Sequence, residues 1–299
     1  MEVRIGQLEV ITQGAGKKGR LHDFLSRLFR EKPLGAAGLI IVIVFLFVGI
    51  FANVLAPHGM NNNNLRHRLE GPSVQFPLGT DHFGRDQLSR IIYGARISMI
   101  VGLASSALAV FVATILGLIS GYWGGKFDIL LQRFVDAIMC FPFLFLVLTL
   151  MSLLGPGLIQ IIIVLGVPWG IANIRTIRGT VMSVKENEYV VAAKSLGCST
   201  WRILWRHILP QLWATIIVLF TITVGGAIVS EATVSFLGYG IPPPQPSWGG
   251  MLSWEGKRYM ARAPLLAVFP GLCLAIVVYG VNMFGDAMRD LLDPRLRDN

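Results

Sequence analysis

Six long apolar runs that lack any charged residue dominate this chain. A helix rises about 1.5 Å per residue, so about 20 apolar residues cross the roughly 30 Å hydrocarbon core of a membrane. Only 14% of the 299 residues are charged, against about 25% in a soluble domain, and the mean hydropathy is +0.62. The runs predict an all-α polytopic membrane protein with six transmembrane helices, at 34–56, 97–121, 137–154, 158–174, 208–230 and 264–285.

Positive charge is divided unevenly between the two sides that six spans define. Of the 26 Lys and Arg residues, 18 fall on the side of both termini and 8 on the other. Cytoplasmic segments carry the excess of Lys and Arg, so we predict that both termini are cytoplasmic. This placement explains the net charge of +9 without a nucleic-acid partner. We interpret the first run as a retained span rather than a signal peptide, because 33 residues precede it and no small-residue cleavage site is evident.

The spans divide the chain into four parts. We expect a basic cytoplasmic tail (1–33), a first transmembrane helix with an outer loop (34–96), a five-helix core (97–288) and a cytoplasmic C-terminal tail (289–299). Apolar residues at helical spacing over 21–29 predict an amphipathic helix along the membrane surface. Proline and glycine inside several spans leave two interpretations open, either close helix packing or breaks beside a translocation pathway.

Motifs that would make the chain an enzyme are missing from the sequence. It contains no GxxxxGKS or GxxxxGKT phosphate-binding loop, no HExxH and no GxSxG. Cys140, Cys198 and Cys273 are far apart and have no histidine at ligand spacing, which predicts free thiols and no metal site. We therefore expect no catalytic residue and no cofactor in this chain, and an energy source in another subunit.

The connection between the fourth and fifth predicted spans is unusually long for a loop, since most connections have only a few residues. Within 186–210, a good helix-forming stretch from Tyr189 is followed by Gly197, which can adopt the positive φ that ends a helix. Ser199 or Thr200 can then cap a second short helix. We expect the small residues Ala192 and Ala193 on one face. This helix–glycine–helix segment therefore has a form that another protein could bind.

The same loop resembles the coupling loop of the membrane subunits of binding-protein-dependent ATP-binding-cassette (ABC) importers. That family's motif reads E-A-A, three residues, G, nine residues, I-x-L-P. Val191, Ala192 and Ala193 stand at the E-A-A positions, Gly197 at the glycine, and Leu209-Pro210 at the end. Two positions depart, since Val191 replaces the glutamate and His207 takes the isoleucine position. These departures weaken a role for a carboxylate at position 191 but leave the form of the loop intact.

Three further segments are similar to the peptide and nickel permease group of that family. They are LGTDHFGRDQLSRIIYGAR at 78–96, VSFLGYGIPPPQPSWGGML at 234–252 and GDAMRDLLDPRLRD at 285–298. The combination resembles the C-type permease subunit of a dipeptide or oligopeptide importer. Nickel, glutathione or another solute stays open as the substrate. An ion-coupled secondary transporter is the alternative class, but the spans lack the paired intramembrane charges it requires.

The resemblance implies the type-I importer permease fold, in the inner membrane of a bacterial or archaeal cell. It also implies a second homologous permease, two cytoplasmic ATPase subunits that bind ATP and Mg²⁺, and an extracytoplasmic substrate-binding protein. The segment from Tyr189 to Pro210 would contact an ATPase. ATP binding would then turn the translocation cavity outward, and hydrolysis would reset it.

Charged residues gather just before the second predicted span. Two roles are open for them: pairing along a helix and reaching lipid headgroups, or contact with a partner on the outer face. The charged residues concerned are Asp81, Arg85, Asp86, Arg90 and Arg96, and Gly84 belongs to the same motif.

Two acidic residues lie near the ends of predicted spans. Glu231 could line the cavity and meet a peptide amino group, or it could mark the point where the fifth helix leaves hydrocarbon. Asp136 is expected in the first turn of the third span, where a carboxylate suits the positive end of the helix dipole.

Overall fold

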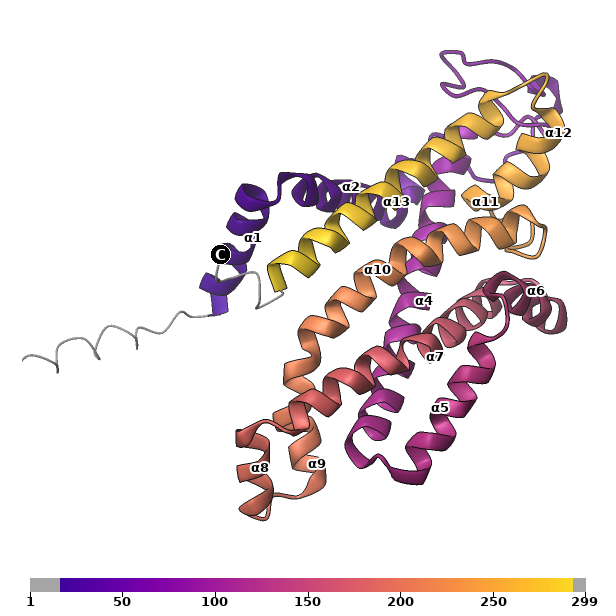
Figure 1. Ribbon diagram of the computed structural model, residues 1–299. Coiled ribbons are helices and arrows are strands. Elements are labelled where there is room, and N and C mark those ends of the chain that lie inside the picture. The colour runs from indigo at the N-terminus through magenta and orange to yellow at the C-terminus, as the bar shows by residue number, and fades with distance from the viewer. Residues whose placement is uncertain (1–16, 293–299) are drawn as a thin grey trace, which may run out of the picture.

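The structure is a computed structural model that describes residues 17–292 (Figure 1). Helices make up the architecture, and the described residues form no strand, only an isolated bridge between Thr80 and Asp86. Five helices are long and apolar enough to cross a membrane, or up to six if a bent pair counts as one span. Parts of the predicted tails, and the last residues of the 285–298 segment, lie outside the described residues.

The long helices cover the predicted spans but extend beyond them. The second runs from Gln87 rather than from 97, and the fourth continues past Arg175 to Lys185. A charged residue interrupts an apolar run in the sequence, but it does not end the helix. Its side chain can reach past the apolar layer and pair there. The long helices are α2 (Pro33–Ile50), α4 (Gln87–Trp123), α7 (Leu158–Lys185), α10 (Leu209–Phe236) and α13 (Leu265–Leu292).

The third predicted span, 137–154, is not one straight helix. It is made from α5 (Gly125–Met139) and α6 (Phe143–Leu154), which meet at an angle of 90°. Pro142 lies at the break as the N-cap of α6, and a proline disfavours helix at the residue before it and removes a backbone donor. Asp136 accordingly lies in the last turn of α5, where it pairs with Arg175 of α7. The prediction that it caps a first turn was therefore wrong.

The fifth span begins earlier than predicted and passes through a proline without breaking. The short α9 (Thr200–Arg202), the π-helical η2 (Ile203–Ile208) and α10 form one apolar helix from Thr200 to Phe236. Pro210 lies inside this continuous helix, directly after the change from π-helical to α-helical hydrogen bonding. The wider π turn before it fits an extra residue into the helix.

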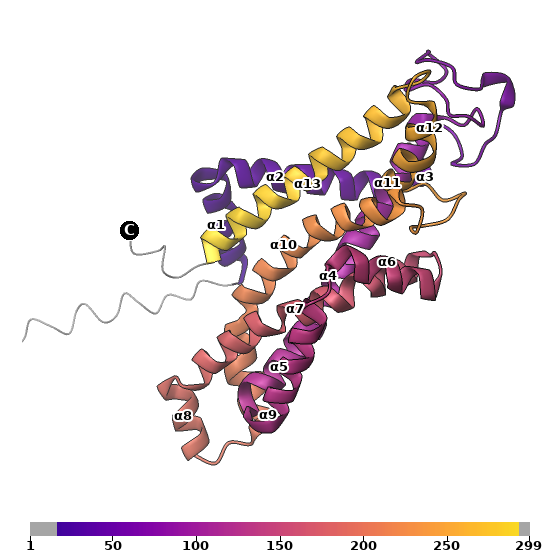
Figure 2. The same cartoon turned by 45° about the vertical axis from the view of Figure 1, so that its right-hand side comes forward.

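Helices α4, α7, α10 and α13 form the packed centre, and α2 lies across α13 (Figures 1 and 2). The crossing of α2 and α13 is close: a Cβ at Gly38 would lie 2.4 Å from the carbonyl oxygen of Gly280. The opposite face of α2 exposes large apolar side chains such as Phe47, at 52%. Such a face fits lipid and not water.

The two ends of the helix bundle carry different elements. The segment before α4 and the short helix α12 (Lys257–Tyr259) lie at one end, with α8 (Glu188–Ser195) and α9 at the other (Figure 2). The amphipathic prediction for 21–29 falls in α1 (Lys17–Glu31), whose Leu28 is buried against Ala36 and Ala287. This helix therefore packs on the protein as well as offering an exposed side. The remaining short elements are α3 (Ala52–Leu55), η1 (Leu65–His67), α11 (Trp248–Gly250) and η3 (Met251–Gly256).

Candidate functional site: the 186–210 loop and the segment before α4

The predicted helix–glycine–helix form of the 186–210 loop is present in the structure. Helix α8 ends at Ser195, and Gly197 follows with a φ of +78°. The Ser199 hydroxyl then accepts a hydrogen bond of 3.4 Å from the backbone N–H of Arg202 and caps α9. A Cβ at Gly197 would meet no atom within 4 Å, so only the positive φ, and not a lack of space, favours glycine there.

Helix α8 has a buried face and an exposed face. Val190 is buried and packs with Ile203 and Ile208 of η2 against α7, and Ala193 is buried as well. The outer face presents Tyr189, Val191, Ala192 and Leu196, of which Leu196 is 85% exposed. Ala192 and Ala193 were predicted from the sequence to lie on one outward face. That prediction was wrong, because Ala192 is exposed and Ala193 is buried. Leu209 and Pro210 lie at the start of α10, where the loop rejoins the bundle.

Polar contacts fix the helices at the base of this loop. The guanidinium of Arg178 on α7 donates two hydrogen bonds of 2.6 Å to the carboxylate of Asp128 on α5. Asp128 also accepts a hydrogen bond from Ser120 of α4. Lys185, at the end of α7, donates to the carbonyl oxygen of Gly121 at 3.0 Å. The loop thus emerges from a braced junction of α4, α5 and α7, which the motif search did not identify.

At the other end of the bundle, the charged residues before α4 are buried. Asp81 is fully buried and accepts hydrogen bonds from the backbone N–H groups of Phe83 (2.8 Å) and Arg85 (2.9 Å). The Arg85 side chain donates to Asp81 at 2.5 Å, and Arg90 lies 3.4 Å from the same carboxylate. With Arg85 6% and Arg90 5% exposed, the headgroup-contact prediction was wrong for these side chains. They form an internal framework.

Two further residues of this segment fix its course. Gly84 has a φ of +72°, and a Cβ there would collide with the Asn64 carbonyl oxygen at 1.7 Å. Asp86 caps α4 by accepting hydrogen bonds from the backbone N–H and the hydroxyl of Ser89 at 2.9 and 2.5 Å. Arg96 differs from the others, because it reaches α2 and donates to the Gly49 carbonyl oxygen at 2.8 Å.

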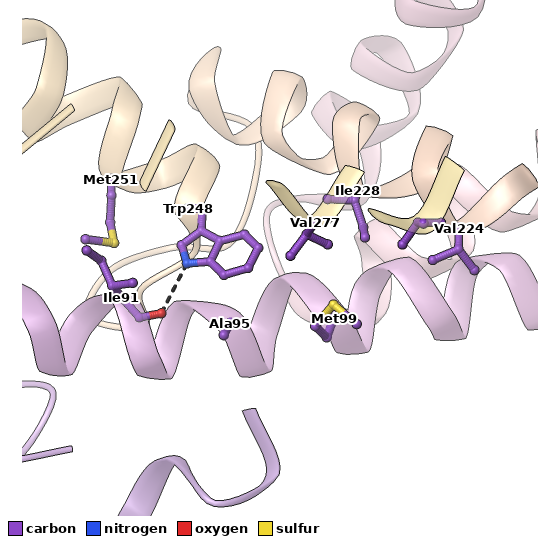
Figure 3. Close-up of a cluster of buried hydrophobic side chains, with 9 residues drawn as sticks. Ile91, Ala95, Met99, Val224, Ile228, Trp248, Met251 and Val277 are labelled. Carbon is purple, nitrogen blue, oxygen red and sulfur yellow. Dashed lines mark hydrogen bonds between the residues drawn. The ribbon is translucent and has the colours of Figure 1, made fainter. Parts of the chain in front are cut away.

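The segment after α10 packs onto the start of α4. The Trp248 side chain is fully buried, and its indole N–H donates a hydrogen bond of 3.1 Å to the carbonyl oxygen of Ile91 (Figure 3). Ala95 and Met99 continue this apolar contact along α4 toward Val277 of α13 (Figure 3). The 78–96 and 234–252 segments, far apart in sequence, therefore build one structural unit.

Glu231 lies inside α10 rather than at its end, since the helix continues to Phe236. Its fully buried carboxylate accepts hydrogen bonds from Ser235 at 2.7 Å and from Ser98 of α4 at 3.3 Å. Among the described residues Glu231 is enclosed between α10 and α4, so its carboxylate does not face an open cavity of this chain.

The remaining titratable side chains of interest are His82 and the three cysteines. His82 packs against the rings of Phe83 and Tyr259, and burial there lowers the pKa of its imidazole. Cys140, Cys198 and Cys273 are free thiols, as predicted. Over the described part of the chain, no cluster of three or more His, Cys, Asp or Glu residues could hold a metal ion.

Taken together, these features define a polytopic helical membrane protein with a rigid protruding loop at one end. Comparison with known protein families identifies the family to which the chain belongs. The family described as binding-protein-dependent transport system inner membrane component matches residues 113–298, and the N-terminal TM domain of oligopeptide transport permease C matches 20–72. The chain belongs to this family of importer permeases, as the three motif segments and the loop suggested.

Several relatives match over nearly their full length. The dipeptide transport system permease protein DppC of Alkalihalophilus pseudofirmus is 40% identical, with 90% of this chain and 88% of that protein covered. The oligopeptide transport system permease protein OppC of Bacillus subtilis is 39% identical over 90% and 88%. The glutathione transport system permease protein GsiD of Pectobacterium atrosepticum is 37% identical over 92% and 91%.

A solved structure shares the fold. The MetNI methionine ABC transporter in an inward-facing conformation superposes with a TM-score of 0.50 at 16% identity, covering 68% of this chain and 96% of that one. The predicted all-α importer permease fold is confirmed, and the protein is a multi-pass inner-membrane permease subunit.

Proposed function

We propose that this chain is the permease subunit of an ATP-driven importer that carries di- and oligopeptides delivered by an external binding protein. The observation that carries the proposal is the similarity along the chain to permeases named for dipeptide and oligopeptide transport. The glutathione permease among the relatives favours glutathione as the second candidate substrate. Glutathione is itself a small peptide, so one cavity chemistry would serve both.

The proposed partners follow from the membership of the family. A second homologous permease would complete the translocation path, and two ATPase subunits, which bind ATP and Mg²⁺, would drive it. Both termini and the 186–210 loop would face the cytoplasm, in agreement with the distribution of Lys and Arg. The opposite end, where the segment before α4 lies, would face the binding protein.

The loop would transmit motion because it is fixed to the bundle on one face and free on the other. The exposed side chains Tyr189, Val191, Ala192 and Leu196 would contact the ATPase, while Val190 holds α8 to η2 and α7. A movement of the ATPase would then move α7 and α10 as one body. Coupling requires that the loop contacts the ATPase differently in its two states, since equal contact would shift no equilibrium.

Uptake of labelled di-, tri- and pentapeptides, glutathione and nickel tests the proposal in cells that carry the chain with its partner subunits. We expect peptide uptake that Gly197→Trp abolishes while membrane insertion is retained. Gly155→Trp is the control, because Gly155, in the turn between α6 and α7, also has a positive φ (+81°) and open space around a Cβ. Nickel uptake without peptide uptake would overturn the peptide assignment, and normal uptake by Gly197→Trp would overturn the role of the loop.

A further inference from the structure

A long apolar groove of about 750 Å³ lies between α4 and the continuous helix that α9, η2 and α10 form. No charged residue is found among the described side chains that line it. Tryptophan is concentrated there, since four of the seven in the chain line the groove and each of these four is more than half exposed. They are Trp123, Trp201, Trp205 and Trp213. The described part of the chain thus leaves this apolar surface uncovered.

The tryptophans place the groove in one half of the membrane. Trp123 is the last residue of α4 and Trp201 is the second residue of α9, so each wall carries an indole where it ends, at the end of the bundle with the 186–210 loop. Tryptophan is enriched at the membrane–water interface, because its ring is apolar and its N–H is polar. From Trp123 the lining continues along α4 to Ala107, about 24 Å of helix, whereas one leaflet contributes about 15 Å of hydrocarbon. The groove therefore runs from one interface through one leaflet.

Two arginines give the interfacial end of the groove a positive charge. Arg202 and Arg206 directly follow Trp201 and Trp205 in the sequence, and both are exposed. Neither guanidinium forms an ion pair with a described residue. The long stem of an arginine can lie on apolar surface while its guanidinium stays at the level of the lipid headgroups. Because a guanidinium binds a phosphate through two parallel hydrogen bonds, this end of the groove suits an anionic headgroup.

We propose that the groove binds an anionic phospholipid of the leaflet on the side of the 186–210 loop. An acyl chain would lie along the tryptophans, and the headgroup phosphate would meet Arg202 and Arg206. A transmembrane helix of another subunit would cover the apolar walls but would offer no fixed anion to the two guanidinium groups, so we assign the groove to a lipid. Leu204 lines the groove and packs in the same cluster as Val190 of α8. The bound lipid would therefore contact the element that carries the loop.

The test uses the chain assembled with its partner subunits in nanodiscs that contain phospholipid with brominated acyl chains, since bromine quenches the fluorescence of a tryptophan that it contacts. Brominated phosphatidylglycerol is compared with brominated phosphatidylcholine at equal mole fraction. We expect at least about fivefold tighter association of phosphatidylglycerol, because one basic residue near an anionic lipid surface contributes about a factor of five. Trp201→Phe with Trp205→Phe should lower this preferential quenching. Trp248→Phe is the control, because that indole is fully buried in the protein.

Arg202→Ala with Arg206→Ala should lower the preference for phosphatidylglycerol at least about fivefold, while lipid still contacts the tryptophans. The matched control is Arg258→Ala with Arg262→Ala, two exposed arginines at and after α12, at the opposite end of the bundle. Equal quenching by the two lipids in the wild type, or a preference that survives the loss of Arg202 and Arg206, would overturn the proposal. So would quenching that the double tryptophan replacement leaves unchanged, since a partner subunit would then cover the groove. These experiments measure lipid contact and not transport, so their failure leaves the proposed function untouched.

Discussion

Arg178 on α7 and Asp128 on α5 are joined by two hydrogen bonds of 2.6 Å, one from Nε and one from Nη2 of the guanidinium. The pair lies at the base of the 186–210 loop and is mostly buried, with the Asp128 side chain 11% exposed. A planar guanidinium matches a carboxylate in this two-point arrangement, which a lysine cannot reproduce. The contact keeps α5 against α7 where the loop leaves the bundle.

Replacement of Arg178 by alanine should destabilise the chain by about 2 kcal/mol, between the values for exposed and buried ion pairs, because the Asp128 carboxylate loses its partner. Thermal unfolding in detergent measures the loss. Arg27→Ala is the control, since its pair with Glu31 is exposed to solvent, and we expect a much smaller change there. Equal losses in the two variants would show that the Arg178 pair is not a brace.

Gly38→Ala should separate α2 from α13. The added Cβ would lie 2.4 Å from the Gly280 carbonyl oxygen and 2.9 Å from the Phe284 nitrogen, both backbone atoms that cannot rotate away. Overpacking of this kind costs about 1 to 3 kcal/mol. Gly179→Ala on α7 is the matched control, because a Cβ there meets nothing within 4 Å and alanine favours helix. Unfolding temperatures that rank the two variants the other way would contradict the described crossing.

His82 should make the stability of the segment before α4 depend on pH. Burial lowers the pKa of His82 below its usual 6.5, so the unfolded chain binds a proton more readily than the folded one. The contribution to stability is therefore present above pH 6.5 and is lost as the pH falls from there toward the folded-state pKa. Unfolding temperatures of the wild type should drop over this window more than those of His82→Asn. Parallel pH profiles would show that His82 is not the responsible group.

Much of the fold could be predicted from apolar run length, because the membrane admits few structures other than helices. Run length could not locate helix ends, since Arg175 and Gln87 lie within helices that extend past the hydrocarbon layer. It also missed the 90° bend between α5 and α6, although Pro142 lies at that position. The effect of a proline depends on its surroundings: Pro168 lies inside α7 and Pro270 inside α13.

The form of the 186–210 loop was predictable because glycine and serine act locally, through positive φ at Gly197 and a cap at Ser199. The burial of Asp81 and Glu231 was not predictable, because it depends on residues distant in sequence or on the conformation of a turn. Ser98, for example, contacts Glu231 from another helix. The positions of charged residues in the sequence therefore predicted where polar clusters lie, but not whether their side chains are buried or exposed.

The central claim is that the form of the 186–210 loop couples ATP hydrolysis to import, and Gly197 tests it most directly. Asparagine tolerates positive φ, whereas a β-branched valine strains it by about 1 to 2 kcal/mol. Both side chains fit the open space around Gly197, so the two variants differ chiefly in the cost of the positive φ. The measurement is peptide uptake per ATP hydrolysed in proteoliposomes that contain all subunits. We predict a ratio near wild type for Gly197→Asn and at least about fivefold lower for Gly197→Val; equal ratios in both variants would contradict the claim.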